Sequence, residues 1–198
     1  MGVGIALMVR AELGLGPWDV LHQGLSRRSG VPIGTVTILV GLAVLGLWVP
    51  LRQRVGVGTV VNAVVVGAVV DGSLWALPHV VPLAVRVPLL AGGVVAVGVG
   101  SGLYIGTGLG PGPRDGLMTG LARRGGSIRR VRTGIELTAL AVGWLLGGSV
   151  GIGTVTFALS IGPLVQVSLG RFELPPAAVG TGGRGGGGGG QYRYLSDL

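Results

Sequence analysis

Long apolar runs, separated by short polar breaks, organise most of this 198-residue chain. A helix needs about 20 apolar residues to span the hydrocarbon core of a bilayer, and most of these runs approach that length. The pattern therefore predicts an all-α fold, a polytopic transmembrane helical bundle. The expected spans lie at residues 33–51, 55–77, 83–105, 133–146 and 150–169, the fourth being short unless it begins near residue 131.

The chain also repeats itself. The segment GLGPWDVLHQGLSRRSG at residues 14–30 returns as GPGPRDGLMTGLARRGG at residues 110–126. Further matches keep the same offset of 96 positions, which falls to 95 beyond the tryptophans; they pair Asp19 with Asp115, Trp48 with Trp144, and the Gly-x-Gly-Thr-Val stretch at 56–60 with that at 151–155. Collinear matches of this kind predict an internal duplication.

The duplication sets the expected organisation. Three spans per repeat force the two halves to insert in opposite orientations, the inverted-repeat arrangement of many secondary transporters. Residues 2–9 match only the end of the span at 83–105, so the first helix is expected to be truncated, and either the gene start is misplaced or the chain is shortened. The expected regions are a first membrane repeat at 1–78, a second at 79–172 and a disordered Gly-rich tail at 173–198.

Composition agrees with a membrane protein. Charged residues make up 11% of the chain, hydrophobic residues 48%, and the mean hydropathy is +0.74. The net charge of +8 rests on arginine alone, without lysine. Because these arginines lie at the ends of apolar runs and form no common face, they are interpreted as topology signals, and no nucleic-acid partner is expected. The absence of cysteine excludes disulfides and thiolate metal sites.

The arginines also orient the predicted bundle. Four of them fall on one side and eleven on the other, and the positive-inside rule places the richer side in the cytoplasm. The C terminus is therefore expected in the cytoplasm, in a multi-pass protein whose surroundings are the lipid bilayer. The four arginines of the poorer side are Arg10, Arg27, Arg28 and Arg86.

The residues of the duplicated segment are those that favour a turn followed by the start of a helix. Its glycines permit a tight reversal, and Pro17 suits the first turn of a helix because its missing N–H costs nothing there. Asp19 then falls near the third helical position, favourable to free backbone amides and the positive end of the helix dipole. Two interpretations stay open: a capped surface helix between spans, or a re-entrant half-helix in each repeat whose N-terminus lines a polar path under protein cover.

Few ionisable or polar groups fall within the spans, and each is costly enough to need a reason. Glu136 follows Arg132 by four residues, so the two are expected either to pair on one helix face or to take part in solute binding. Asp71 lies late in its span and Gln166 occupies the matching place in the other half. The residues of the candidate polar or substrate path are Asp19, Asp115, Arg114, Asp71, Glu136 and Gln166.

Other chemistry is not indicated. His22 and His79 are isolated, so no metal site is expected. No nucleophile stands beside a base, which argues against an enzyme, and no cofactor is expected. Trp48 and Trp144 lie near helix ends, where an interfacial belt is the plain interpretation.

Five segments together carry a resemblance to a known family; they read GLGPWDVLHQGLS, VGVGTVVNAVVVGAVVD, GLGPGPRDGLMTGLA, VRTGIELTALAVGWLLGG and GIGTVTFALSIGPLVQ. From Gly2 to Phe172 the chain resembles the YczE-type bacterial membrane proteins, related to the wider YitT group. The resemblance implies a protein integral to the bacterial cytoplasmic membrane, in a family without an established biochemical activity.

Two functions from different classes remain. The first is a small-molecule permease, or a substrate-binding membrane subunit, with its solute site between the repeats and the Asp19 and Asp115 half-helices facing it. The alternative is a non-transporting membrane scaffold or regulator that acts through membrane or cytoplasmic protein partners, with the arginine-rich loop at 123–132 as its contact.

Overall fold

Eight α-helices and no strands make up the described part of the chain, which a computed structural model gives for residues 1–53, 55–79, 82–107, 110–124 and 127–172. The tail expected at 173–198 lies outside the described residues. The helices are α1 (Gly2–Ala11), α2 (Pro17–Ser29), α3 (Ile33–Leu51), α4 (Val57–Ala76), α5 (Leu83–Gly106), α6 (Pro113–Ala122), α7 (Ile128–Leu145) and α8 (Ile152–Phe172).

Four of these helices, α3, α4, α5 and α8, are long and apolar enough to cross a membrane. They coincide with four of the five expected spans to within three residues at each end. The fifth, α7, begins at Ile128, five residues earlier than expected, and its first turns contain Arg129, Arg130 and Arg132. It is therefore not among the four apolar spans, although it is 18 residues long.

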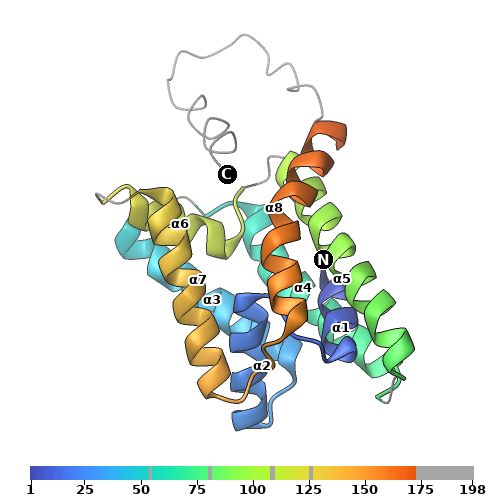
Figure 1. Cartoon of the computed structure of the whole chain (residues 1–198). Helices are drawn as coiled ribbons and strands as arrows, with labels where there is room; N and C mark the ends of the chain where they lie inside the picture. Colours follow the sequence, from blue (N-terminus) through green and yellow to red (C-terminus); the bar gives the residue numbers. More distant parts are fainter. Residues whose placement is uncertain (54, 80–81, 108–109, 125–126, 173–198) are drawn as a thin grey trace.

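The interior is built by close approach of helices. α1 lies against α5, where the backbones near Gly4 and Gly93 come together and Met8 fills the neighbouring space. One buried cluster gathers around Met8 and Leu90, and another joins Trp48 of α3 to Leu117 of α6. α2 is held between α7 and α3, as Figure 1 shows at the lower left of the bundle.

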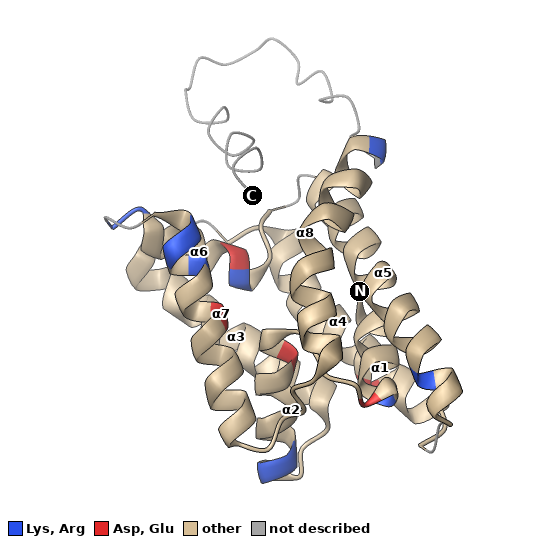
Figure 2. Ribbon diagram, viewed as in Figure 1, with Lys and Arg blue, Asp and Glu red and all other residues tan. Residues whose placement is uncertain are grey.

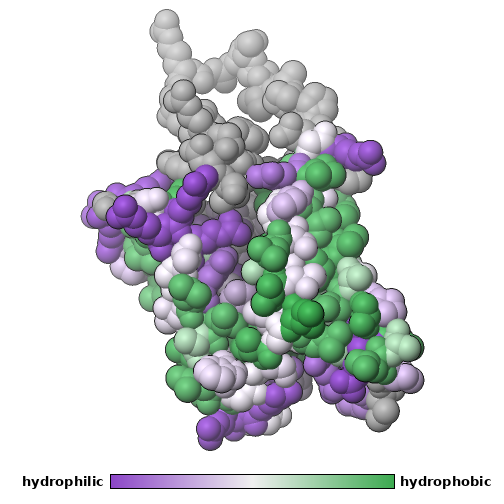
Figure 3. Space-filling model, in the orientation of Figure 1, coloured by the Kyte–Doolittle hydropathy of each residue, from purple (hydrophilic) through white to green (hydrophobic). Residues whose placement is uncertain are grey.

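The outer surface is apolar around the middle and charged at two ends. Large hydrophobic side chains such as Val57, Trp75 and Leu159 are exposed, as expected for helices that face lipid. Figure 3 shows hydrophobic surface on the flanks of the bundle, with hydrophilic surface gathered above and below. In Figure 2 the arginines of α6, α7 and α8 lie at the upper end, whereas those of α2 and α5 lie at the lower end.

A candidate polar site between two short helices

The short helices α2 and α6 begin in the same way. Each has a glycine before its first residue, a proline at the first helical position and an aspartate in the first turn. Two residues before each N-cap stands a glycine with positive φ, 112° at Gly14 and 119° at Gly110, a conformation that side chains disfavour. The predicted turn chemistry of the duplicated segment, with Asp19 and Asp115 at the third helical position, is therefore confirmed.

Each turn rests on the first turn of a long helix from the other half of the chain. The backbone N–H of Gly153, at the start of α8, donates to the carbonyl of Leu13 at 2.7 Å. The hydroxyl of Thr59, at the start of α4, donates to the carbonyl of Pro111 at 2.8 Å. The starts of α2 and α6 are thus anchored to α8 and α4 respectively.

The first part of α2 is buried within the protein. Its buried residues include Asp19, which is 4% exposed, and His22, which is 1% exposed. Gly24 approaches the carbonyl of Gly143 so closely that an added Cβ would overlap it, which brings α2 against α7. The first part of α2 is therefore covered by other helices, whereas residues 27–29 at its end are exposed.

Five side chains from three helices meet at the start of α2. Arg114 of α6 reaches Asp19, with its Nη2 donating to Oδ1 at 3.4 Å, and the same nitrogen lies 3.5 Å from Nδ1 of His22. His22 Nδ1 is also 3.6 Å from Asp19 Oδ1 and 3.1 Å from the hydroxyl of Thr37 on α3. The guanidinium of Arg114 lies 5.1 Å from the ring centroid of Trp18, in cation–π contact.

Burial makes this cluster costly unless its charges are compensated. A carboxylate in a low-dielectric interior needs a partner of opposite charge, which Arg114 provides for Asp19. Arg114 itself keeps 34% of its side-chain surface exposed, so the cluster is reachable from its side. His22 Nε2 and Trp18 Nε1 are buried without a hydrogen-bond partner among the described residues. Beside the charge pair there are therefore two nitrogen atoms whose hydrogen bonds are not satisfied.

A second charged group adjoins the first. Arg132 donates from Nε to Glu136 Oε1 at 3.1 Å, so the expected pairing of these residues along α7 is confirmed. Asp115 is exposed and interacts electrostatically with Arg132, Arg114 and Glu136. Arg114 and Asp115, adjacent on α6, therefore connect the two groups.

The other two candidate path residues lie elsewhere. Asp71 accepts hydrogen bonds from the backbone N–H groups of Gly34 and Thr35, at 2.6 and 2.7 Å, and from the Thr35 hydroxyl at 2.9 Å. It therefore caps the start of α3 from α4. Gln166 is exposed on α8, and no described residue makes a hydrogen bond to it. Of the six candidates, the structure brings together Asp19, Arg114, Asp115 and Glu136.

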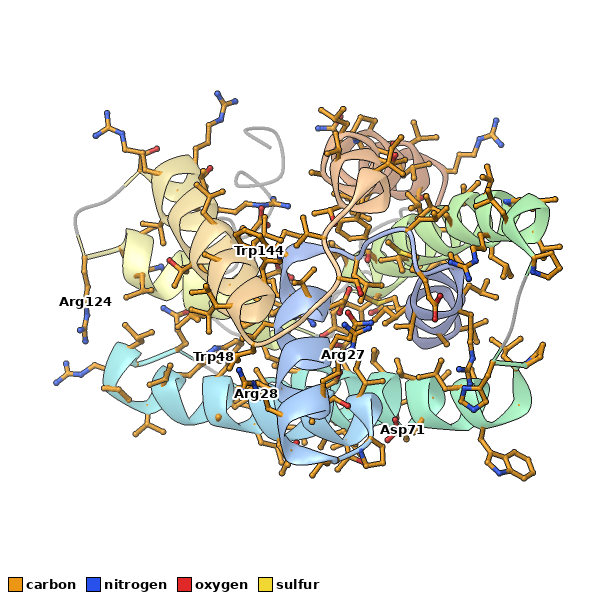
Figure 4. The ribbon with its side chains drawn as sticks, turned by 60° about the horizontal axis from the view of Figure 1, so that its bottom comes forward. Arg27, Arg28, Trp48, Asp71, Arg124 and Trp144 are labelled. Carbon is orange, nitrogen blue, oxygen red and sulfur yellow. The ribbon has the colours of Figure 1, made fainter. Side chains whose placement is uncertain are left out.

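The interfacial interpretation of the paired tryptophans is wrong for Trp48. Its side chain is fully buried, and its Nε1 donates to the carbonyl of Pro113 at 3.1 Å, at the start of α6. Trp144 is 65% exposed, near the end of α7. In Figure 4 Trp48 and Asp71 lie near opposite ends of α3, one supporting α6 and the other capping α3.

Sequence reasoning missed His22, Thr37 and Trp18 as members of the site. The spacing of Asp19 and His22, three residues apart on one helix, was the available signal for His22. Within the described residues, no group of three or more His, Cys, Asp or Glu side chains could hold a metal ion.

The sequence comparisons give the family. A family described as "Family of unknown function (DUF6198)" matches residues 1–169. The chain belongs to the DUF6198 family. A relative from Haemophilus influenzae, named only "Uncharacterized protein", is 40% identical to this DUF6198 chain over 170 residues, covering 85% of it and 78% of the relative.

Two further relatives come from Bacillus subtilis. The "Uncharacterized membrane protein YczE" is 33% identical over 172 residues, covering 85% of this chain and 80% of its own, and the "Uncharacterized protein YyaS" is 26% identical over 174 residues, covering 84% and 86%. No solved structure matches the chain. The resemblance to YczE-type proteins is therefore confirmed, and this DUF6198 chain is a multi-pass membrane protein.

Proposed function

We propose that this DUF6198 protein is a small-molecule permease, or the substrate-binding membrane subunit of one, with its solute site at Asp19, His22 and Arg114. The observation that carries the proposal is the Asp19–Arg114 pair, which joins the first turns of two short helices inside a membrane protein. Ionisable residues at such depth are rare and commonly mark solute or ion pathways.

The proposed architecture is a pair of inverted three-helix repeats, with α2 and α6 as re-entrant half-helices. Its support is the reciprocity of the contacts: the turn before α2 rests on α8, and the turn before α6 rests on α4. Figure 1 adds that α2 runs toward the lower end of the bundle while α6 lies near the upper end. Broken helices whose N-termini meet near the midplane form the solute sites of several transporter folds.

The chemistry of the site favours a small zwitterionic solute. Asp19 offers a carboxylate and Arg114 a guanidinium, and their contact of 3.4 Å is long for a charge-assisted hydrogen bond. A solute with one cationic and one anionic group can replace this contact with two shorter ones. The partly exposed side of Arg114 is the approach, and the unpartnered Nε1 of Trp18 is a further donor.

Uptake into proteoliposomes tests this function. The purified chain is reconstituted, and uptake of a mixture of radiolabelled L-amino acids is compared with that of protein-free liposomes. Because a charge-assisted contact contributes about 1.5–3 kcal/mol, Arg114→Gln is expected to lower uptake by at least about tenfold. Arg28→Gln, an exposed arginine outside the site, is the matched control. Unchanged uptake by a folded Arg114→Gln protein would remove the site assignment.

A second candidate function follows from the charged upper end. Arg123, Arg124 and Arg129 are exposed there, around the start of α7, and could contact an acidic surface of a cytoplasmic or membrane partner. If no flux is measured for any amino acid, and a cross-linked partner is lost when Arg123 and Arg124 become glutamine, the scaffold function is favoured over the permease.

A further inference from the structure

A groove of about 460 Å³ runs between α2 and α7, beside the polar site described above, with which it shares Trp18. Trp18 and Leu21 of α2 form one wall, and a single face of α7 forms the other. The lining residues of α7 recur every three or four positions, as residues on one side of a helix do. They are Arg130, Val131, Gly134, Ile135, Thr138, Ala139 and Val142.

The groove is elongated and has a charged residue at one end. From Arg130 to Val142 it follows α7 for about 18 Å, at 1.5 Å per residue. Its walls are mostly apolar, with Thr138 as a polar residue along them and Arg130, at one end, as the one charged lining residue. That end is the arginine-rich upper end of the bundle in Figure 2.

The groove is open to the surroundings of the bundle. Gly134 and Thr138, both in its lining, are exposed, and α7 lies on the outside of the bundle in Figure 1. The face of α7 turned further outward exposes Leu137 and Leu145, as lipid-facing residues do. Water fills an apolar groove poorly, whereas an acyl chain of the surrounding bilayer fills it without loss of solvation.

The positive charge at the upper end of the groove favours a lipid with an anionic headgroup. Arg130 is exposed and has no hydrogen bond or ion pair with any described residue. Arginine beside a membrane surface attracts anionic lipid. We propose that the groove holds one anionic phospholipid, with its phosphate on Arg130 and an acyl chain along α7 against Trp18 and Leu21. This site does not depend on the permease function.

Two substitutions test the two parts of the site separately. Gly134 lines the groove, and a Cβ added there meets no atom within 4 Å, so Gly134→Leu introduces a bulky side chain at a lining position that has open space for its first carbon. Gly46→Leu is its matched control, because Gly46 on α3 also has open space and lies outside the groove. Arg130→Gln removes the head contact, and Arg171→Gln, at the end of α8, removes an exposed arginine that does not line the groove.

Native mass spectrometry of the detergent-solubilised protein, titrated with phosphatidylglycerol or phosphatidylcholine of equal chain length, gives the measurement. We expect the wild type to prefer phosphatidylglycerol by about fivefold, the effect of one arginine at a membrane surface. Arg130→Gln should abolish that preference, and Gly134→Leu should weaken the binding of both lipids, while the two controls behave as the wild type does.

Three outcomes would overturn the assignment. Equal binding of the two lipids by the wild type removes the anionic head. A preference that survives in both Arg130→Gln and Gly134→Leu places the lipid elsewhere. A dimer that is lost in Gly134→Leu, without any change in lipid binding, assigns the groove to a second copy of the chain.

Discussion

Asp19 and Arg114 differ in how deeply they lie, and the difference decides how each will respond to mutation. The Asp19 side chain is 5% exposed and cannot recover its hydration, whereas Arg114 keeps 34% of its surface. Removing Arg114 therefore leaves a buried carboxylate without its counter-charge, a larger penalty than the pair itself is worth. Removing both charges spares that penalty.

A double-mutant cycle makes this quantitative. Arg114→Gln is expected to lower the free energy of unfolding by about 1–3 kcal/mol, with the exposed part of Arg114 holding it below the cost at a fully buried pair. The double variant Asp19→Asn with Arg114→Gln should be more stable than Arg114→Gln alone. Unfolding in mixed micelles of dodecyl maltoside and SDS measures all of these variants. Strictly additive effects would show that the two side chains are not coupled.

At the scale of whole helices, the two halves of the chain differ where their sequences differ. α3 and α4 touch at Gly34 and Gly67, whose backbones approach so closely that neither position has room for a Cβ. The matching positions are Arg130 on α7 and Gly162 on α8, and a Cβ at Gly162 would meet nothing within 4 Å. Close packing thus joins α3 to α4, and Asp71 strengthens that contact from α4.

Asp71 supplies a cap that α3 lacks in its own sequence. No side chain next to Ile33 caps this helix, so the free N–H groups of its first turn are satisfied from α4. Asp71→Ala is expected to lower the free energy of unfolding by about 2–3 kcal/mol, because charge-assisted hydrogen bonds are lost and part-buried donors are left unpaired. The same mixed-micelle unfolding measures it.

Gln166→Ala is the control for this prediction, since it alters the matching position on α8, where the side chain is exposed. It should change stability by no more than about 0.5 kcal/mol. Equal effects of the two substitutions would contradict the capping role of Asp71.

Helix bounds were predictable where an apolar run meets a strong break, as at Pro32 and Arg52 around α3. The start of α7 was not, because hydropathy penalises Arg129 and Arg130 although arginine is a good helix former. The site was predictable only in part. Asp19 was singled out by its place in the duplicated segment, and Arg114 was named among the candidate path residues. Their contact, 95 positions apart, depends on tertiary packing that no local pattern records.

At the scale of the whole molecule, the division of charge between two ends carries a prediction about orientation. The arginines around α6 and the start of α7 lie at the upper end, and those at the end of α2 lie at the lower end. The positive-inside rule then places the upper end in the cytoplasm. In this orientation Ser29, at the end of α2, is expected on the outer side of the membrane.

Because the chain contains no cysteine, a single introduced thiol reports this orientation without background. Ser29 and Ser127 are both exposed, one at the end of α2 and the other at the N-cap of α7. In intact cells a membrane-impermeant maleimide should label Ser29→Cys, whereas Ser127→Cys should react only after the membrane is permeabilised. The reverse result would invert the topology, and labelling of both in intact cells would mean that α2 and the start of α7 lie on the same side.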